Sequence, residues 1–166
     1  MSTYYTTADT PAGPFTMIVD ADEAVLASGW TSDVRELAIL TPATARLTGH
    51  PEHRGRLGLP SKALESYVDG DLTAIDDVPV RQHSGEFLNH AWEVLRKVPA
   101  GAPVTYTEFA ARAGRPAAVR AAAMACARNA AALFVPCHRV LRLDGTLGGF
   151  RWGVPVKRWL LDHEAI

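Results

Sequence analysis

The chain has 166 residues, 48% hydrophobic and 21% charged, with a formal net charge of −1, which is ordinary for a globular protein of one or two compact parts. No apolar run reaches about 18 residues, which excludes a membrane-spanning helix, and Met1–Tyr5 lacks the pattern of a signal peptide, so we expect a cytoplasmic protein. Cys126 and Cys137 are too few for a disulfide framework or a four-thiolate zinc site, so we expect no metal site and at least one reduced thiol.

The N-terminal half predicts a small subdomain with strands. Short β-rich runs at Thr3–Thr7, Phe15–Val19 and Ala24–Trp30 alternate with turn residues, as in hairpins or a small meander. The stretch Thr48–Pro60 is rich in Gly, Pro and His and predicts a loop, whereas Ser61–Val68 predicts a short helix.

The second half begins with helical spacing. Apolar residues from Phe87 to Val98 recur at offsets near 3.6, which predicts a helix from Ser84. Thr105 and Glu108 have the spacing of a capping box, so the next helix should begin at Thr105 and stop at Gly114. A further helix from Pro116 to Asn129 would complete a helix-turn-helix.

This further helix carries seven alanines between Ala117 and Ala127. Alanine favours helices in any context, which is one interpretation. The other is a slim helix that presses its backbone close to a partner, with Arg120 and Arg128 projecting from it.

Charge is distributed unevenly along the chain. Residues 1–84 hold 12 acidic and 6 basic side chains, and residues 85–166 hold 6 acidic and 11 basic ones. The second half is therefore suited to meet an anion such as nucleic acid, unless the imbalance is a chance property of two solvated surfaces.

Beyond Asn129, the apolar run Leu133–Val140 predicts a buried strand that Pro136 interrupts just before Cys137. A glycine-rich loop, Asp144–Gly149, follows, and Pro155 opens a final helix that ends near Glu164. The pair Cys137-His138 is by itself more often a buried thiol beside an unrelated imidazole, because neighbours on a strand point to opposite faces.

The longer pattern changes that interpretation. Three segments stand in order: Val135-Pro136-Cys137-His138-Arg139-Val140, the glycine-rich loop, and Trp159-Leu160-Leu161-Asp162-His163-Glu164. Together they resemble the O6-alkylguanine-DNA alkyltransferase family. Ala125-Cys126-Ala127 and Phe150-Arg151-Trp152-Gly153 make the resemblance strongest to the C-terminal domain of the bacterial adaptive-response protein Ada.

The resemblance implies an α/β (α+β) fold. Residues 1–80 would form a small RNase H-like N-terminal subdomain, a part where the likeness is loose. Residues 81–166 would form a mainly helical alkyltransferase domain with the helix-turn-helix and the active-site strand and loop.

The resemblance also implies direct-reversal DNA repair by a single-turnover methyltransferase that needs no cofactor. Cys137 would take the alkyl group from O6-alkylguanine irreversibly. His138 would accept the thiol proton through a water, and Glu164 would hold the imidazole. Asn129 would tie the second helix to the active-site turn, and the Tyr106 hydroxyl would donate to the guanine ring.

The implied partner is double-stranded DNA, bound by a monomer in the minor groove with the damaged base flipped out. Arg120 would fill the gap that the base leaves, and the alanine-rich helix would fit the narrow groove. The expected DNA contacts also include Tyr106, Thr107, Arg115 and Arg128. The expected substrate pocket includes Val140, Arg139, Arg151 and Trp152, with the indole restricting bulky alkyl groups.

Two other functions stay open on the sequence. A non-catalytic sensor of alkylated bases would bind the same DNA, but the members that act so lack the cysteine. A thiol hydrolase using Cys137 and His138 would need an oxyanion site and would turn over repeatedly.

Overall fold

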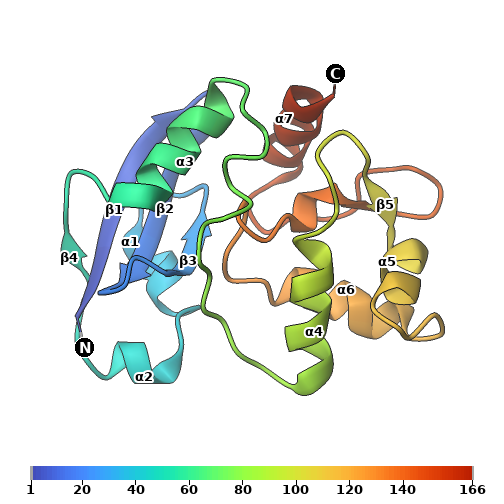
Figure 1. Cartoon of the computed structure of the whole chain (residues 1–166), viewed down its shortest axis with the longest axis horizontal. Coiled ribbons are helices and arrows are strands. Elements are labelled where there is room, and N and C mark those ends of the chain that lie inside the picture. The colour runs from blue at the N-terminus through green and yellow to red at the C-terminus, as the bar shows by residue number, and fades with distance from the viewer. Residues whose placement is uncertain (1, 166) are drawn as a thin grey trace. The chain divides into compact units, whose positions relative to one another are not determined.

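The computed structural model describes residues 2–165, which form two compact units (Figure 1). The first unit extends to Gln82 and also contains Ala130–Phe134, and the second contains His83–Asn129 and the chain from Val135 onward. The division after Gln82 lies two residues beyond the boundary expected at residue 80, but the return of Ala130–Phe134 to the first unit was not expected. Within the described residues, no helix combines the length and the apolar character that crossing a bilayer requires.

A four-stranded sheet forms the centre of the first unit. Its strands are β1 (Thr3–Thr10), β2 (Gly13–Asp20), β3 (Val25–Gly29) and β4 (Glu52–His53), in the order β3-β2-β1-β4. The first three pair antiparallel, whereas β4 pairs parallel with β1. The three strands predicted from the sequence are thus confirmed, and β2 is buried from Phe15 to its end because it lies inside the sheet.

Three helices complete the first unit. The predicted helix is confirmed as α3 (Gly58–Val68), which begins three residues earlier than expected. The helices α1 (Val34–Ala38) and α2 (Ala43–Arg46) were not predicted, because four or five residues are too few to show a helical period.

The predicted strand over residues 133–140 is wrong. Leu133 and Phe134 lie in a turn, Val135 lies in a bend, and Leu133 has a positive φ of 79° that no extended strand allows. Residues before them lie along the edge of β3, where Ser28 donates from its backbone N to Ala130 O at 2.9 Å and from Oγ to Ala132 O at 2.7 Å. The segment is apolar because it is buried, and burial does not require an extended backbone.

The second unit is mainly helical (Figure 1). Its elements in chain order are α4 (Glu86–Leu95), β5 (Val104–Thr105), α5 (Tyr106–Arg112), α6 (Val119–Ala127), a 3-10 turn (Cys137–Arg139), β6 (Val140–Leu141) and α7 (Val154–Glu164). The short strands β5 and β6 pair parallel. Leu95, Phe109 and Leu160 are fully buried in the core, and the Trp92 indole donates to Ala125 O at 2.8 Å.

The predicted helix-turn-helix is present as α5 and α6. Thr105 caps α5 through both bonds of a capping box with Glu108, and the left-handed Gly114 (φ 87°) ends its last turn. The second helix begins at Val119, later than expected, because residues 115–118 form a turn closed by Ala118 N donating to Arg115 O.

We expect Thr105→Ala to lower the free energy of unfolding by about 1 kcal/mol, because the amide of Glu108 loses its capping acceptor. Thr107→Ala, at an exposed position of the same helix, is the matched control and should stay within about 0.5 kcal/mol of the parent. Urea unfolding followed by circular dichroism measures both. Equal losses in the two variants would show that the cap is not what stabilises α5.

Candidate active site

The 3-10 turn at Cys137–Arg139 holds the thiol, the imidazole and a guanidinium inside the second unit. Cys137 is 8% exposed, His138 0% and Arg139 2%. Pro136 precedes the turn and donates no backbone N–H, while Val140 N closes it by donating to Cys137 O. The tight turn gathers side chains that a strand would have sent to opposite faces.

The carboxylate of Glu164 binds two residues of this turn. His138 Nε2 lies 2.7 Å from Glu164 Oε2, and Arg139 donates from Nε at 2.9 Å to Oε1 and from Nη2 at 3.0 Å to Oε2. Burial alone would raise the pKa of Glu164, but hydrogen bonds from His138 and Arg139 lower it to about 2. Glu164 is therefore an anion at neutral pH.

Arg139 does not line a substrate pocket, in contrast to our expectation. Its Nη1 donates to Val98 O at 2.7 Å, and its other nitrogens bind Glu164. A guanidinium so enclosed links the turn to the end of α7 and to the segment after α4. We assign it a structural role.

The environment of His138 selects one tautomer. Burial lowers its pKa, against the opposing effect of Glu164, so the ring is neutral at pH 7. A neutral ring beside a carboxylate carries its proton on Nε2 and donates it to Glu164. Nδ1 is then an acceptor, and it is buried without a hydrogen-bond partner among the described residues. The geometry leaves this nitrogen available to receive a proton.

Asn129 connects the end of α6 to Cys137. Its Nδ2 donates to Val135 O at 2.7 Å, and its side chain also forms a hydrogen bond with the Cys137 thiol. Burial raises the pKa of Cys137, while this hydrogen bond and the charges of Lys157 and Arg151 oppose the rise. These contacts agree with the role that the resemblance implied for Asn129.

Tyr106 opens α5 and is half-buried near both thiols. Burial, followed by the proximity of Cys126 and Cys137, raises its pKa to about 12. The hydroxyl is therefore protonated at neutral pH and can donate. Gly148, in the glycine-rich loop, lies against the ring: a Cβ added there would stand 3.7 Å from Cε2 of Tyr106.

The other expected pocket residues lie around this loop. Val140 uses its N–H on Cys137 O, and its carbonyl accepts from Lys157 Nζ at 2.9 Å, so only the second lone pair of that carbonyl remains to read a base. Arg151 is exposed and donates from Nη2 to Ala127 O at 2.7 Å, which fastens the loop to the C-terminus of α6. Trp152 beside it is half-buried.

Lys157 is the site residue that the sequence did not reveal. Its side chain is fully buried, although lysines on a terminal helix are usually solvated. The sequence held one indication of this burial: the helical spacing of α7 places Lys157 on the same buried face as Leu160 and Glu164. The sequence could show that this face of the helix is buried. It could not show whether the ammonium of a lysine on that face lies in the core or reaches solvent.

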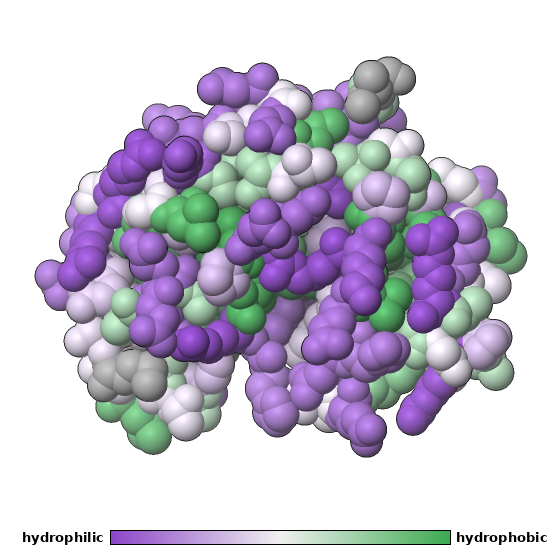
Figure 2. Space-filling model, viewed as in Figure 1, coloured by the Kyte–Doolittle hydropathy of each residue, from purple (hydrophilic) through white to green (hydrophobic). Residues whose placement is uncertain are grey.

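The residues expected to contact DNA, apart from the half-buried Tyr106, are exposed on the helix-turn-helix. Thr107, Arg115, Arg120 and Arg128 all have exposed side chains. Figure 2 shows long hydrophilic side chains over the region of α4 and α5. On α6, Arg120 lies on the face away from the buried Ala122 and Ala125, and the exposed Arg128 follows as the C-cap residue.

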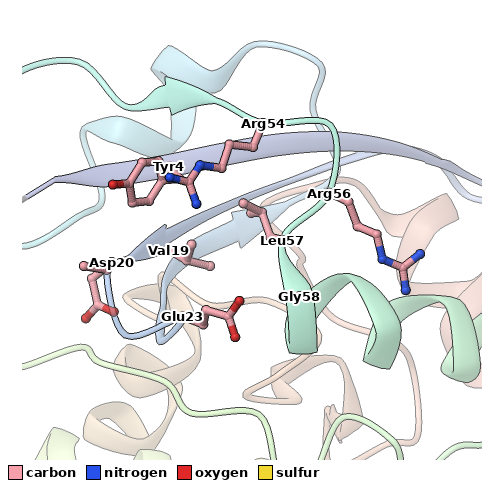
Figure 3. Close-up of a pocket in the computed structure, with 9 residues that line it drawn as sticks. Tyr4, Val19, Asp20, Glu23, Arg54, Arg56, Leu57 and Gly58 are labelled. Carbon is pink, nitrogen blue, oxygen red and sulfur yellow. The ribbon is translucent and has the colours of Figure 1, made fainter.

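The first unit contains a separate pocket, lined among others by Tyr4, Glu23 and Arg54 (Figure 3). The Arg54 guanidinium lies 3.6 Å above the Tyr4 ring, and the Glu23 carboxylate fills the space that a side chain at Gly58 would need. No cysteine, serine or histidine lines this pocket. Across residues 2–165, moreover, no three His, Cys, Asp or Glu side chains are grouped so that they could hold a metal ion.

The chain is similar to a known family of proteins. Residues 86–166 match the family described as 6-O-methylguanine DNA methyltransferase, DNA binding domain. The chain is 34% identical over 156 residues to the methylated-DNA–protein-cysteine methyltransferase of Shigella flexneri, covering 93% of this chain and 91% of the relative. The chain belongs to the O6-methylguanine-DNA methyltransferase family.

Further likenesses agree with this family. Over 88 residues, 53% of this chain and 25% of the relative, the identity to the bifunctional transcriptional activator/DNA repair enzyme Ada of Escherichia coli K12 is 48%. The O6-methylguanine methyltransferase of Mycobacterium tuberculosis has a TM-score of 0.79 at 28% identity, covering 98% of this chain and 93% of that one. Its complex with DNA has a TM-score of 0.81 at 29% identity, covering 98% and 92%. The family and the fold class predicted from the sequence are confirmed.

We expect the stability of the protein to fall as the pH drops from about 5 toward 2. The pKa of Glu164 is about 2 in the folded chain, below its ordinary value of 4.5, so the unfolded state binds a proton first. The contribution of this ionised carboxylate is complete above pH 5 and is lost as the pH approaches 2. Urea unfolding at a series of pH values measures it.

Glu164→Gln should remove this part of the pH dependence and cost on the order of 3 kcal/mol at pH 7, because Arg139 stays buried without its anion. Glu93→Gln, an exposed carboxylate on α4 of the same unit, is the control and should keep the parental pH dependence. Parallel loss of stability in Glu164→Gln and the parent between pH 5 and 2 would contradict the assignment.

Proposed function

We propose that this chain repairs DNA by transferring the alkyl group of O6-alkylguanine irreversibly to Sγ of Cys137. The observation that carries the proposal is the buried set of Cys137, His138 and Glu164, in which a neutral imidazole in the same 3-10 turn as Cys137 keeps one nitrogen as a free acceptor. Membership in a family of methylated-DNA–protein-cysteine methyltransferases supports it.

The transfer balances with the groups present. The Cys137 thiol loses its proton to His138 Nδ1 through a water, and Glu164 stabilises the resulting imidazolium. The thiolate attacks the alkyl carbon, so that the S–C bond forms as the C–O6 bond breaks. The Tyr106 hydroxyl donates a hydrogen bond to the guanine ring and so stabilises the departing guanine anion, which then takes a proton from solvent while the His138 imidazolium releases its own. The thioether has no leaving group that water could displace, so each molecule acts once.

The second unit is suited to bind duplex DNA. Its family match is to a DNA-binding domain, and the exposed arginines lie on α5, α6 and the turn between them. We propose that α6 enters the minor groove and that Arg120 takes the place of the flipped base. A monomeric state and a cytoplasmic location stay predictions from the sequence.

Incubation with an excess of duplex DNA containing O6-methylguanine should add one methyl group to the peptide that holds Cys137, and mass spectrometry detects it. The amount should stop at one equivalent of protein. Cys137→Ser should gain none, and Cys126→Ser, which removes the other thiol, should gain as much as the parent. DNA binding without an adduct would favour a sensor, and product beyond one equivalent would favour a hydrolase.

Arg120→Ala should slow single-turnover repair of duplex DNA by about 10- to 100-fold, because the extrahelical base loses the side chain that replaces it in the stack. Reaction with free O6-methylguanine base should change by less than about twofold, since no base needs to be flipped. Arg112→Ala removes the same charge from α5 and is the matched control. If it slows repair as much as Arg120→Ala does, then general attraction to phosphate accounts for the effect.

A further inference from the structure

Lys157 is a fully buried cation without a carboxylate partner. Its Nζ donates to Val140 O at 2.9 Å and to Gly149 O at 3.4 Å. Of the Asp and Glu side chains among residues 2–165, none forms an ion pair with it. Carbonyl dipoles compensate a buried ammonium only partly, so an anion beside Nζ would be strongly stabilised.

The neighbours that can become anionic are thiols. Burial lowers the pKa of Lys157, and Cys137 and Cys126 oppose this effect while the guanidinium of Arg142 adds to it. The carboxylate of Glu164, two turns further along α7, is bound by His138 and Arg139 instead. Lys157 is therefore a positive charge that the resting, protonated site does not neutralise.

Hydrogen bonds hold this charge next to the turn that carries the nucleophile. Lys157 binds the carbonyl of Val140, whose N–H donates to the carbonyl of Cys137. Its second acceptor, Gly149 O, belongs to the glycine-rich loop. The ammonium is thus fixed relative to Cys137 by α7, by β6 and by the loop at once.

We propose that Lys157 is a positioning residue that keeps a positive charge beside Cys137 and thereby stabilises the thiolate that accepts the alkyl group. This inference rests on the proposed function and adds to it the source of the nucleophile's ionisation. The charge stays in place when the thiol loses its proton, and after transfer it faces an uncharged thioether. The ionisation of Cys137 should depend on Lys157 more than on any other single cation.

The remaining groups around the thiol cannot replace it. Arg151 also favours the thiolate, but it is exposed and therefore screened by solvent. Asn129 contributes a neutral hydrogen bond, and Cys126 and Tyr106 carry no positive charge. His138 becomes positive only by taking the proton, and both Lys157 and Arg139 disfavour that form while Glu164 favours it.

The test is the pH dependence of Cys137 alkylation by iodoacetamide, measured on the full chain carrying Cys126→Ser so that one thiol reacts. Lys157→Gln keeps a donor for the carbonyls and removes the charge. It should move the midpoint of the rate profile up by about one pH unit or more and slow alkylation at pH 7 about tenfold. Above both midpoints the two rates should agree within about twofold, which a merely distorted site would not allow.

Lys157→Arg restores the charge and should bring the midpoint back toward that of the parent. Circular dichroism and affinity for undamaged duplex DNA verify that each variant is folded. Identical midpoints in the parent and in Lys157→Gln would overturn the proposal.

A reciprocal measurement needs no change at Lys157. With ¹³C-labelled lysine, the Cε shift of Lys157 reports its titration, and Cys137→Ser removes the anion that it faces. Because coupling between two groups is mutual, Lys157 should then lose its proton at lower pH than in the parent. An unchanged titration would overturn the proposal even where Lys157→Gln does not fold.

A measurement of methyl transfer from DNA distinguishes failure of this proposal from failure of the proposed function. The rate at pH 7 should fall in Lys157→Gln by the same factor as alkylation by iodoacetamide. If the parent transfers no methyl group while the midpoint still shifts, then the proposed function fails and the role of Lys157 stands. If the parent transfers methyl and the midpoint stays, then the role of Lys157 fails alone.

Discussion

Glu164 ends α7 with a buried carboxylate that His138 and Arg139 bind together, at 2.7 to 3.0 Å. Two consecutive residues reach one carboxylate because the backbone around Cys137 forms a 3-10 turn and not a strand. The shared anion fixes the tautomer of His138 and neutralises Arg139. It also attaches the turn to α7, from which Lys157 reaches Val140. The arrangement of Cys137, His138 and Lys157 depends on this contact.

Among the buried charges of the site, one positive charge is left without an anionic partner. Arg139 and Glu164 neutralise each other, and burial keeps His138 uncharged. Lys157 remains, with carbonyls and thiols around it. A site of this kind disfavours a second cation and favours a negative charge on sulfur, so electrostatics opposes part of the effect of burial on the Cys137 thiol.

The helix α6 serves both the surface and the interior of the second unit. Its outer face presents Arg120, and its C-cap residue Arg128 is exposed as well, whereas Asn129 just after its end binds Val135 and the Cys137 thiol. Arg151 fastens the glycine-rich loop to the same end. The side-chain amide of Asn129 therefore connects the end of α6 to the Cys137 thiol. For this reason, few bonds separate the exposed surface of α6 from the buried Cys137 thiol.

The sequence by itself determined the elements whose signals are local. These are the meander, the helix that Thr105 caps, the helix that Pro155 opens and, through a contiguous motif, Cys137 with its family. Tertiary structure decided the conformation of residues 133–139, since an apolar run records burial and not backbone shape. It also decided the enclosure of Arg139 and the burial of Lys157, 20 residues after Cys137. The sequence contains those residues, but the free energy of a buried charge depends on which groups the fold brings around it.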